Sequence, residues 1–216
     1  MMNLKEKISS VIFDCDGVMF DSRQANIHYY NHLLAHFGLP PMTEDKVPFV
    51  HMHTADESVG YIFQGTPYVE EAEEYRLQMD YSPFIKDMII EPGLKELLRA
   101  LRPHFRLAVA TNRSNTIGDV LERFGLTGFF DIVVSSLDVS NPKPHPESIF
   151  KILDFFGIGP DQSIYVGDSL VDYETTNAAG VLFISYKNRE LEADYHVDGL
   201  MDIVGKVLGS RLGTQN

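Results

Sequence analysis

Short apolar runs that alternate with helical patterns constrain the fold of this chain more than any other feature of its sequence. The runs cover residues 10–13, 106–111, 131–136, 163–167 and 181–185. Runs of this kind are typical of strands that are buried on both faces of a sheet. The segments between them carry apolar residues at helical spacing, and two of these patterns stop at Gly125 and Gly157. The alternation predicts an α/β fold with helices on both faces of a doubly wound parallel sheet.

Residues 20–87 interrupt this alternation. They contain no convincing strand pattern but several helical segments, including 24–37 and 67–79. A block of this kind between the first strand and the next strand–helix unit predicts a small helical domain of its own. The sheet domain is then discontinuous in sequence and comprises residues 1–19 and 88–216.

Composition restricts the classes of function. The 216 residues are 44% hydrophobic and 23% charged, which is ordinary for a globular protein with a full core. The formal net charge of −13 leaves no basic stripe to neutralise nucleic-acid phosphates, so we expect no nucleic-acid partner. A small anionic substrate needs only one local positive site and stays compatible with this charge.

The same composition bears on the compartment. No stretch approaches the length of a membrane span, and residues 1–10 lack the apolar run of a signal peptide. A single cysteine, Cys15, suits a reducing compartment. We therefore expect a cytoplasmic protein without membrane association, and no obligate protein partner is evident.

Reactive side chains follow the predicted strands. Asp14 follows the first strand, Thr111 ends the second and Asp168 follows the fourth. Lys143 follows the third strand, in the Pro-rich segment NPKPHPE. Open parallel sheets bind ligands at the carboxyl ends of their strands, so we expect these side chains to converge on one site. Burying carboxylates is unfavourable unless something pairs with them, which points to a metal ion, another cation or chemistry.

The order of these motifs resembles that of the haloacid dehalogenase superfamily over nearly the whole core. DCDGV (14–18) resembles the first motif, TNRSN (111–115) the second, Lys143 the third and GDSLVD (167–172) the fourth. The helical insertion after the first motif resembles the cap of subfamily I, as in phosphoglycolate phosphatases and β-phosphoglucomutases. The resemblance implies a Rossmann-like core and an α-helical cap that closes over the site and excludes bulk water.

The resemblance also implies roles for individual residues in a phosphatase. Asp14 is the candidate nucleophile, which attacks phosphorus and forms an aspartyl phosphate. Asp16 would protonate the leaving oxygen and then deprotonate the water that hydrolyses the intermediate. The Thr111 hydroxyl and the Asn112 amide would hold the oxygens of the transferring group. Lys143 would offset the repulsion between the anionic nucleophile and the phosphate.

Mg²⁺ is the implied cofactor, because this ion prefers hard oxygen ligands. Asp14, the main-chain carbonyl of Asp16 and the Asp168 carboxylate are the expected protein ligands, with Asp172 in the outer shell. The alternative for Asp172 is that it only caps the helix after Asp168. Phosphonate-cleaving and dehalogenating relatives lack a carboxylate at the position of Asp16, so its presence favours a phosphate ester or anhydride. We expect a small phosphorylated metabolite as the substrate.

The inserted segment contains further candidates. His51 and His53, in HMHTADES (51–58), lie in an expected loop between cap helices, where the family tends to place residues that touch the leaving group. They are candidate substrate contacts, and the alternative is exposed loop histidines. Arg23 and Arg76 have the same status.

Two other features of the sequence invite a chemical role. His28, His32 and His36 are spaced at i, i+4 and i+8, but no Glu or Cys completes a metal site, so we expect a solvated or cap-facing stripe. Strand alternation turns Cys15 away from the neighbouring carboxylates, so we expect it to be a small core residue.

Three alternative functions remain to be weighed. A sugar phosphomutase similar to β-phosphoglucomutase would use the same site and return the phosphoryl group to the sugar. A receiver-like signalling module is also a doubly wound sheet with an acidic pocket, but it takes phosphate on a later strand, is about half as long and carries no cap. A catalytically silent, partner-binding relative is the third alternative, but every motif position carries a competent residue.

Overall fold

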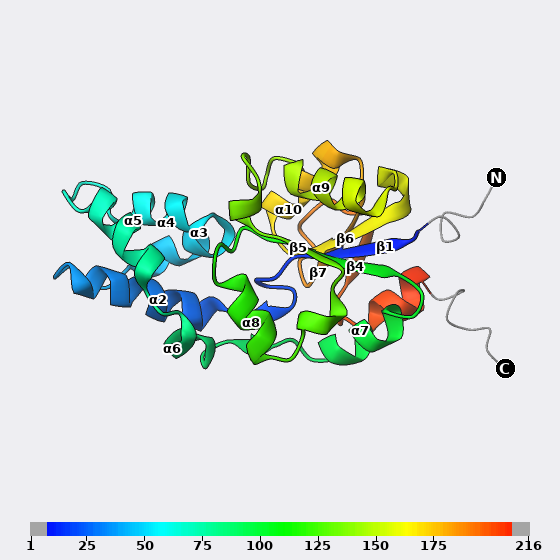
Figure 1. Cartoon of the computed structure of the whole chain (residues 1–216), viewed down its shortest axis with the longest axis horizontal. Coiled ribbons are helices and arrows are strands. Elements are labelled where there is room, and N and C mark those ends of the chain that lie inside the picture. The colour runs from blue at the N-terminus through cyan, green and yellow to red at the C-terminus, as the bar shows by residue number, and fades with distance from the viewer. Residues whose placement is uncertain (1–7, 209–216) are drawn as a thin grey trace.

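A six-stranded parallel sheet lies at the centre of one half of the molecule in this computed structural model, which describes residues 8–208 (Figure 1). The strands are β1 (Ser10–Phe13), β4 (Arg106–Ala110), β5 (Ile132–Val134), β6 (Ser163–Gly167), β7 (Leu182–Tyr186) and β8 (Tyr195–Val197). Their order is β5–β4–β1–β6–β7–β8, and all neighbours are parallel. The chain builds outward on one side of β1 and then on the other, so the predicted doubly wound α/β fold is confirmed.

Helices cover both faces of this sheet. They are α7 (Leu94–Leu101), α8 (Ile117–Arg123), α9 (Glu147–Phe156) and α10 (Leu170–Ala179). Val11 and Phe13 of β1 belong to the apolar cluster that contains α7 and α8, whereas Ile12 belongs to the cluster that contains α9 and α10. Because successive side chains of a strand point to opposite faces, a strand between two helical layers has to be apolar throughout. This explains why the sequence shows continuous runs there.

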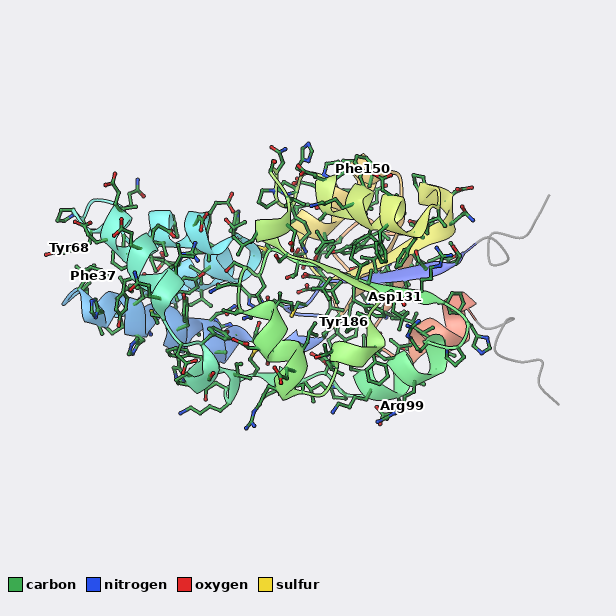
Figure 2. The ribbon with its side chains drawn as sticks, in the orientation of Figure 1. Phe37, Tyr68, Arg99, Asp131, Phe150 and Tyr186 are labelled. Carbon is green, nitrogen blue, oxygen red and sulfur yellow. The ribbon has the colours of Figure 1, made fainter. Side chains whose placement is uncertain are left out.

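The segment between β2 (Phe20–Asp21) and β3 (Ile89–Ile90) contains helices only. They are α2 (Arg23–His36), α3 (Val47–Met52), α4 (Ala55–Ile62), α5 (Val69–Gln78) and α6 (Ser82–Ile85). Figure 1 shows them as a group beyond one end of the sheet, and Figure 2 shows Phe37 and Tyr68 at its far tip. The predicted division into a core and a cap of residues 20–87 remains a prediction with which this arrangement agrees.

The chain enters and leaves this helical group through two adjacent strands. Phe20 pairs with Ile90 and Asp21 with Ile89, in an antiparallel two-stranded sheet. The sequence analysis expected no strand in residues 20–87, and Phe20–Asp21 departs from that expectation because two residues are too few to produce a pattern.

Other short elements complete the fold. Segments of 3₁₀ helix cover Glu44–Lys46, Thr127–Phe129, Ser136–Asp138 and Pro160–Gln162, and a π-helical segment covers Ile203–Leu208. The edge strand β8 was not predicted, because its three residues, Tyr-His-Val, lack a continuous apolar run. No helix in the described part of the chain is both long and apolar enough to cross a membrane.

Candidate active site

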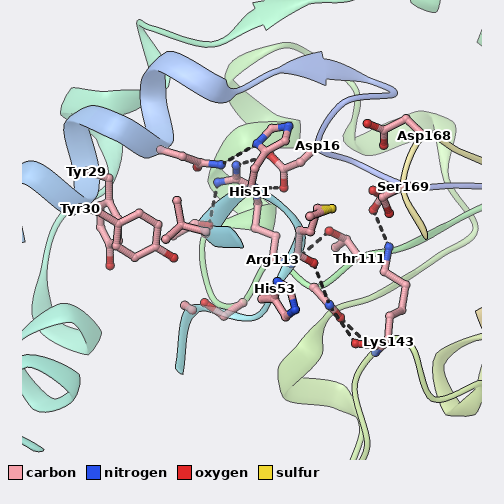
Figure 3. Close-up of a pocket in the computed structure, with 18 of the residues that line it drawn as sticks. Asp16, Tyr29, Tyr30, His51, His53, Thr111, Arg113, Lys143, Asp168 and Ser169 are labelled. Carbon is pink, nitrogen blue, oxygen red and sulfur yellow. Dashed lines mark hydrogen bonds and ion pairs between the residues drawn. The ribbon is translucent and has the colours of Figure 1, made fainter. Parts of the chain in front are cut away.

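The polar residues that follow the strands line one pocket at the carboxyl edge of the sheet (Figure 3). The pocket encloses about 700 Å³, counted out to its opening to solvent. The predicted site residues in its lining are Asp14, Asp16, His51, His53, Thr111, Asn112, Lys143 and Asp168. Asp172 is fully buried behind them. The fold thus gathers side chains from four strand ends and from the inserted segment at one place.

Lys143 connects two of the carboxylates. Its Nζ atom lies 2.8 Å from Asp14 Oδ1, 2.7 Å from Asp172 Oδ1 and 3.0 Å from the Tyr165 hydroxyl. Burial by itself would lower the pKa of Lys143, but the Asp14 and Asp172 carboxylates outweigh burial and raise this pKa well above its usual value. Lys143 is therefore a permanent cation beside Asp14.

Asp172 has donors on both carboxylate oxygens. Oδ1 accepts from Lys143 and from the Tyr165 hydroxyl, which lies 3.0 Å away. Oδ2 accepts from the main-chain N–H groups of Asp168 and Ser169 and from the Ser169 hydroxyl, at 3.2, 3.1 and 2.7 Å. Asp172 thus caps the first turn of α10 and also holds Lys143. A carboxylate so fully occupied fits a place outside the direct ligands of a metal ion.

Asp168 lacks the cationic partner that the other site carboxylates have. Oxygens of Asp14, Asp168 and Asp172 lie within 4.8 Å of one another, but among the ion pairs of residues 8–208 none includes Asp168. Burial, and then the Asp172 and Asp14 carboxylates, raise the pKa of Asp168 to about 9. Two buried carboxylates, Asp14 and Asp172, and two half-buried ones, Asp16 and Asp168, face two cations, Lys143 and Arg113, which leaves an excess of negative charge. An oxygen-only donor set with this excess fits a divalent ion such as Mg²⁺.

The backbone at Gly17 gives Asp168 its place. Gly17 has φ of +81°, and a Cβ atom there would lie 2.2 Å from Asp168 Oδ2. Only glycine adopts this conformation freely and leaves this space. The carboxylate of the fourth motif therefore packs against the turn of the first.

Asp14 lies close to Lys143 and to Asp168. Its main-chain N–H donates to Val166 at 2.9 Å, which fixes the turn after β1. Burial raises the pKa of Asp14 to about 7, with Lys143 acting in the opposite direction and Asp172 adding to the increase. Its Oδ1 atom is held by Lys143 at 2.8 Å.

Asp16 has a different partner, Arg113, which the sequence analysis did not assign to the site. Arg113 Nη2 lies 2.5 Å from Asp16 Oδ1, and Nε lies 3.2 Å from Oδ2. The Ser22 hydroxyl also donates to Oδ1. Burial would raise the pKa of Asp16, but Arg113 outweighs burial and, with His51, lowers this pKa. The sequence could have pointed to Arg113 through its charge, since Arg113 is the one ionisable residue in the TNRSN motif.

Thr111 and Asn112 form hydrogen bonds that hold the loop after β4 and the loop that carries Lys143. The Thr111 hydroxyl accepts from the Arg113 N–H at 3.1 Å. The Asn112 side chain accepts from the Lys143 N–H and donates to the Lys143 carbonyl, both at 3.0 Å. The Asn112 side chain thus positions the lysine loop, and the predicted phosphate contact rests on the main-chain amide of Asn112.

His51 and His53 line the pocket, but the predicted loop around them is shorter than expected. His51 lies in the last turn of α3, and α4 begins at Ala55 after the Thr54–Glu57 capping box. A loop over all of 51–58 was therefore wrong, because Thr54 starts a helix there. His51 Nδ1 lies 3.2 Å from Asn26 Nδ2, and His53 Nδ1 donates to the Phe49 carbonyl at 2.9 Å.

The remaining basic and histidine candidates lie outside the pocket lining. Arg76 is buried inside the helical group and pairs with Asp56 and Glu73, while Arg23 is exposed and pairs with Glu44. The three spaced histidines have separate surroundings: His28 pairs with Asp87, His32 packs on Phe84 and His36 stacks on Tyr75. Among residues 8–208 they form no metal-ligand cluster. Cys15 is fully buried in the core, as expected.

The fold and the site define a class of protein: a doubly wound α/β protein with an acidic, lysine-containing site at the strand ends and a helical insertion after β1. The sequence model of the haloacid dehalogenase-like hydrolase family matches residues 11–186, which include all four motifs. The chain belongs to this family.

Individual relatives agree with this assignment. A HAD-superfamily hydrolase of subfamily IA from Geobacter sulfurreducens PCA has a solved structure that is 38% identical, with a TM-score of 0.82 over 92% of this chain and 98% of that chain. A phosphoglycolate phosphatase from Chromobacterium violaceum is 28% identical over 197 residues, 85% of this chain and 86% of that protein. A pyrophosphatase, PpaX, from Bacillus velezensis is 26% identical over 222 residues, 92% of this chain and 96% of that protein. The chain is thus an enzyme of a hydrolase family, and two of these three relatives are named as phosphatases.

Proposed function

We propose that this enzyme is a Mg²⁺-dependent phosphatase that hydrolyses a small phosphorylated metabolite through an aspartyl phosphate. The observation that carries the proposal is the cluster of Asp14, Asp168 and Asp172 oxygens within 4.8 Å, two of them held by one buried lysine. A site of this kind concentrates positive charge from Lys143 and from a bound ion on an incoming phosphate. We also propose that the enzyme acts in the cytoplasm, where its single buried thiol would stay reduced.

The first half of the reaction forms the covalent intermediate. Lys143 holds Oδ1 of Asp14, so Oδ2 is the oxygen that attacks phosphorus. As the new O–P bond forms, the bond between phosphorus and the leaving oxygen breaks, and the electron pair stays on that oxygen. Asp16, after taking up a proton from solvent, supplies the proton that the leaving oxygen then takes. The Thr111 hydroxyl and the Asn112 amide hold the oxygens of the phosphoryl group.

The second half restores the enzyme. Asp16, now ionised, takes a proton from water as the water oxygen attacks the phosphorus of the aspartyl phosphate. The bond between Asp14 and phosphorus breaks, and inorganic phosphate leaves. Bound Mg²⁺, held by Asp14, Asp168 and the Asp16 carbonyl, would neutralise charge on the phosphate and screen it from the carboxylates. Asp172 keeps Lys143 in place throughout.

The test is phosphate release from p-nitrophenyl phosphate, with and without metal. We expect activity with Mg²⁺, none with EDTA and inhibition by Ca²⁺, whose looser coordination lets both Asp14 oxygens bind the ion. Asp14→Asn should be inactive, and Asp119→Asn, which changes an exposed aspartate of α8, is the matched control. Full activity in metal-free buffer would contradict the proposal.

The substrate is then sought with a panel that includes phosphoglycolate, pyrophosphate, sugar phosphates and nucleoside monophosphates. Free phosphate as the product supports a phosphatase. An isomerised sugar phosphate in its place would identify the alternative, a phosphomutase similar to β-phosphoglucomutase.

A further inference from the structure

Arg113 is hydrogen-bonded to the carboxylate of Asp16, which the proposed reaction needs as its acid and base. Both Asp16 oxygens accept hydrogen bonds from its guanidinium, Oδ1 from Nη2 at 2.5 Å and Oδ2 from Nε at 3.2 Å. Ser22 adds a further donor to Oδ1. A carboxylate held through both oxygens in this way is turned toward Arg113 and is not free to turn toward a leaving group. Asp16 can act on the substrate only after Arg113 has released at least one of these oxygens.

Arg113 cannot simply be left without a partner. Its side chain is 5% exposed, and its other side-chain partners include the Thr116 hydroxyl at 3.2 Å, the face of Tyr81 at 5.1 Å and the Cys15 thiol. None of these three groups carries charge. A buried cation that loses its carboxylate is strongly unfavourable, so another anion has to take the place of Asp16.

The protein does not provide that anion within the pocket. The acidic residues of its lining are Asp14, Asp16 and Asp168. In the proposed reaction Asp14 and Asp168 bind the metal ion, and Asp14 also attacks the phosphate. Around Arg113 the lining is neutral or basic: Tyr81 lies under the guanidinium, and His51 is close by with its partner Asn26. Figure 3 shows His51 beside Arg113 and Asp16. The replacement must therefore arrive with the substrate.

We propose that Arg113 exchanges partners when the substrate binds: it leaves Asp16 and pairs with an anionic group on the leaving portion of the substrate. The inference rests on the proposed phosphatase function and adds a substrate class to it. The preferred substrates are phosphate esters or anhydrides whose leaving group carries its own carboxylate or phosphate. Binding of that group frees the Asp16 carboxylate, which takes a proton from solvent and passes it to the leaving oxygen, so Arg113 is a specificity-determining residue.

The first test compares three substrates that differ in the leaving group. In 2-phosphoglycolate it carries a carboxylate, in inorganic pyrophosphate it is itself a phosphate, and in 2-hydroxyethyl phosphate it is neutral and of similar size. We expect kcat/KM for one of the two anionic substrates to exceed that for the neutral one by about 10- to 100-fold, the range of a charge-assisted pair. The anionic substrate that is preferred identifies the recognised group.

Variants of Arg113 then show whether this residue causes the preference. Arg113→Met should reduce the ratio of the two kcat/KM values to near one, and Arg113→Lys should reduce it partly, since lysine keeps the charge but not the planar fork. The matched control is Arg102→Met, which removes another bidentate Arg–Asp pair, to Asp131 at 2.7 Å, outside the pocket; its ratio should stay that of the wild type. If Arg113→Met does not fold, the ratio of Arg113→Lys decides. A wild-type ratio in the Arg113 variants would overturn the proposal.

A second test removes the competing partner. In Asp16→Asn the guanidinium no longer has a carboxylate to leave, so the anionic group of the substrate should bind it more readily. We expect kcat to fall for every substrate, while KM falls about three- to tenfold further for the preferred anionic substrate than for 2-hydroxyethyl phosphate. Equal changes in KM for both would show that the Asp16–Arg113 pair is only structural.

Failure of this inference is distinguishable from failure of the proposed function. Metal-dependent hydrolysis of p-nitrophenyl phosphate and a phosphate adduct on Asp14 test the chemistry, and neither needs a second anionic group. An enzyme that passes these tests but shows no preference for an anionic leaving group retains the proposed function and loses the role of Arg113.

Discussion

Asp14 and Asp16 are two residues apart, yet their neighbours give them different chemistry. Asp14 lies against Lys143 and the other metal-side carboxylates, whereas Asp16 lies against Arg113 and Ser22. The residue between them, Cys15, lies at the bend after β1 with its side chain in the core. A single turn after β1 can thus present one carboxylate to phosphorus and the other to the leaving group.

This difference predicts separate effects of two substitutions. Asp14→Asn should abolish turnover, because an amide is a poor nucleophile. Asp16→Asn keeps the nucleophile and should lower kcat by about 10²–10⁴-fold, the usual contribution of general acid–base catalysis. With an activated aryl phosphate, whose leaving group needs little acid, the first step suffers least and phosphate should accumulate on Asp14. Mass spectrometry of the quenched protein measures this adduct, and a phosphate that mapped to another residue would contradict the mechanism.

The sequence identified the site residues that carry a motif but not those that position them. Asp14, Lys143 and Asp168 could be found because strand ends meet at one edge of a parallel sheet. Tyr165 could not, because it lies inside the apolar run of β6 and looks like a core residue, although its hydroxyl lies 3.0 Å from Lys143. Arg113 was missed because its partner, Asp16, lies on another strand end, 97 residues away.

At the scale of elements, the turn after β1 and the loop between β6 and α10 are packed too closely for any side chain at position 17. A Cβ atom on Gly17 would lie 2.2 Å from Asp168 Oδ2, and Gly17 also has φ of +81°. Gly17→Ala should therefore displace Asp168 and reduce Mg²⁺-dependent activity by about 10²-fold.

Gly38→Ala is the matched control for this prediction. Gly38 also has positive φ, +68°, but nothing lies within 4 Å of a Cβ atom there. The control should lose about 1–2 kcal/mol of stability from its backbone conformation and keep its Mg²⁺ dependence. Kinetics as a function of Mg²⁺ concentration, together with thermal unfolding, separate the two effects. Equal metal dependence in both variants would show that the contact with Asp168 is unimportant.

The junction of α3 and α4 is the second element-scale feature with a measurable consequence. His51 and His53 reach the pocket from this junction, and His51 lies close enough to Asp16 to lower the pKa of that carboxyl. Replacing either with Ala should raise KM or lower kcat for the physiological substrate by about two- to tenfold, as expected for one lost hydrogen bond. A small aryl phosphate should be less affected. Equal losses on both substrates would argue against contacts with the leaving group.

Helices and strands with long patterns were predicted well, and short ones were not. The run at 163–167 coincides with β6, and the pattern that stops at Gly157 coincides with the end of α9. The helix that begins at Ala55 was predicted as loop, because the capping residue Thr54 was read as part of a polar stretch. Capping decides such boundaries, and a cap is a single residue.

For the whole molecule, the excess of negative charge in the site makes stability depend on pH and metal together. Burial and neighbouring carboxylates raise the pKa of Asp168 to about 9, and burial raises that of Asp14 to about 7. A carboxyl group with a higher pKa in the folded protein binds its proton more tightly there, so the free energy of unfolding falls as pH rises through this range. Asp16 and Asp172 have lowered pKa values, so their contributions change only in more acidic solution.

We therefore expect Tm in EDTA to decrease from about pH 5 to about pH 9, and the increase in Tm caused by Mg²⁺ to grow over the same range, because the ion replaces protons. Each kcal/mol corresponds to about 2–4 °C for a chain of this size. Asp168→Asn should flatten both curves, and Asp119→Asn should leave them parallel to the wild type. Thermal unfolding at several pH values, with and without Mg²⁺, measures this. A Tm in EDTA that rose with pH would refute the charge assignment.

The strands β2 and β3 have a consequence for how such a protein can change over time. Because Phe20 pairs with Ile90 and Asp21 with Ile89, the start and the end of the inserted helices are neighbours in space. A stretch held between adjacent points can grow, shrink or be exchanged without altering the distance that the remaining chain must span. The register of the sheet, and with it the spacing of Asp14 and Lys143, is independent of the insert. Evolution can therefore keep the residues proposed to act on phosphorus and replace the whole inserted segment, which would contact the rest of the substrate.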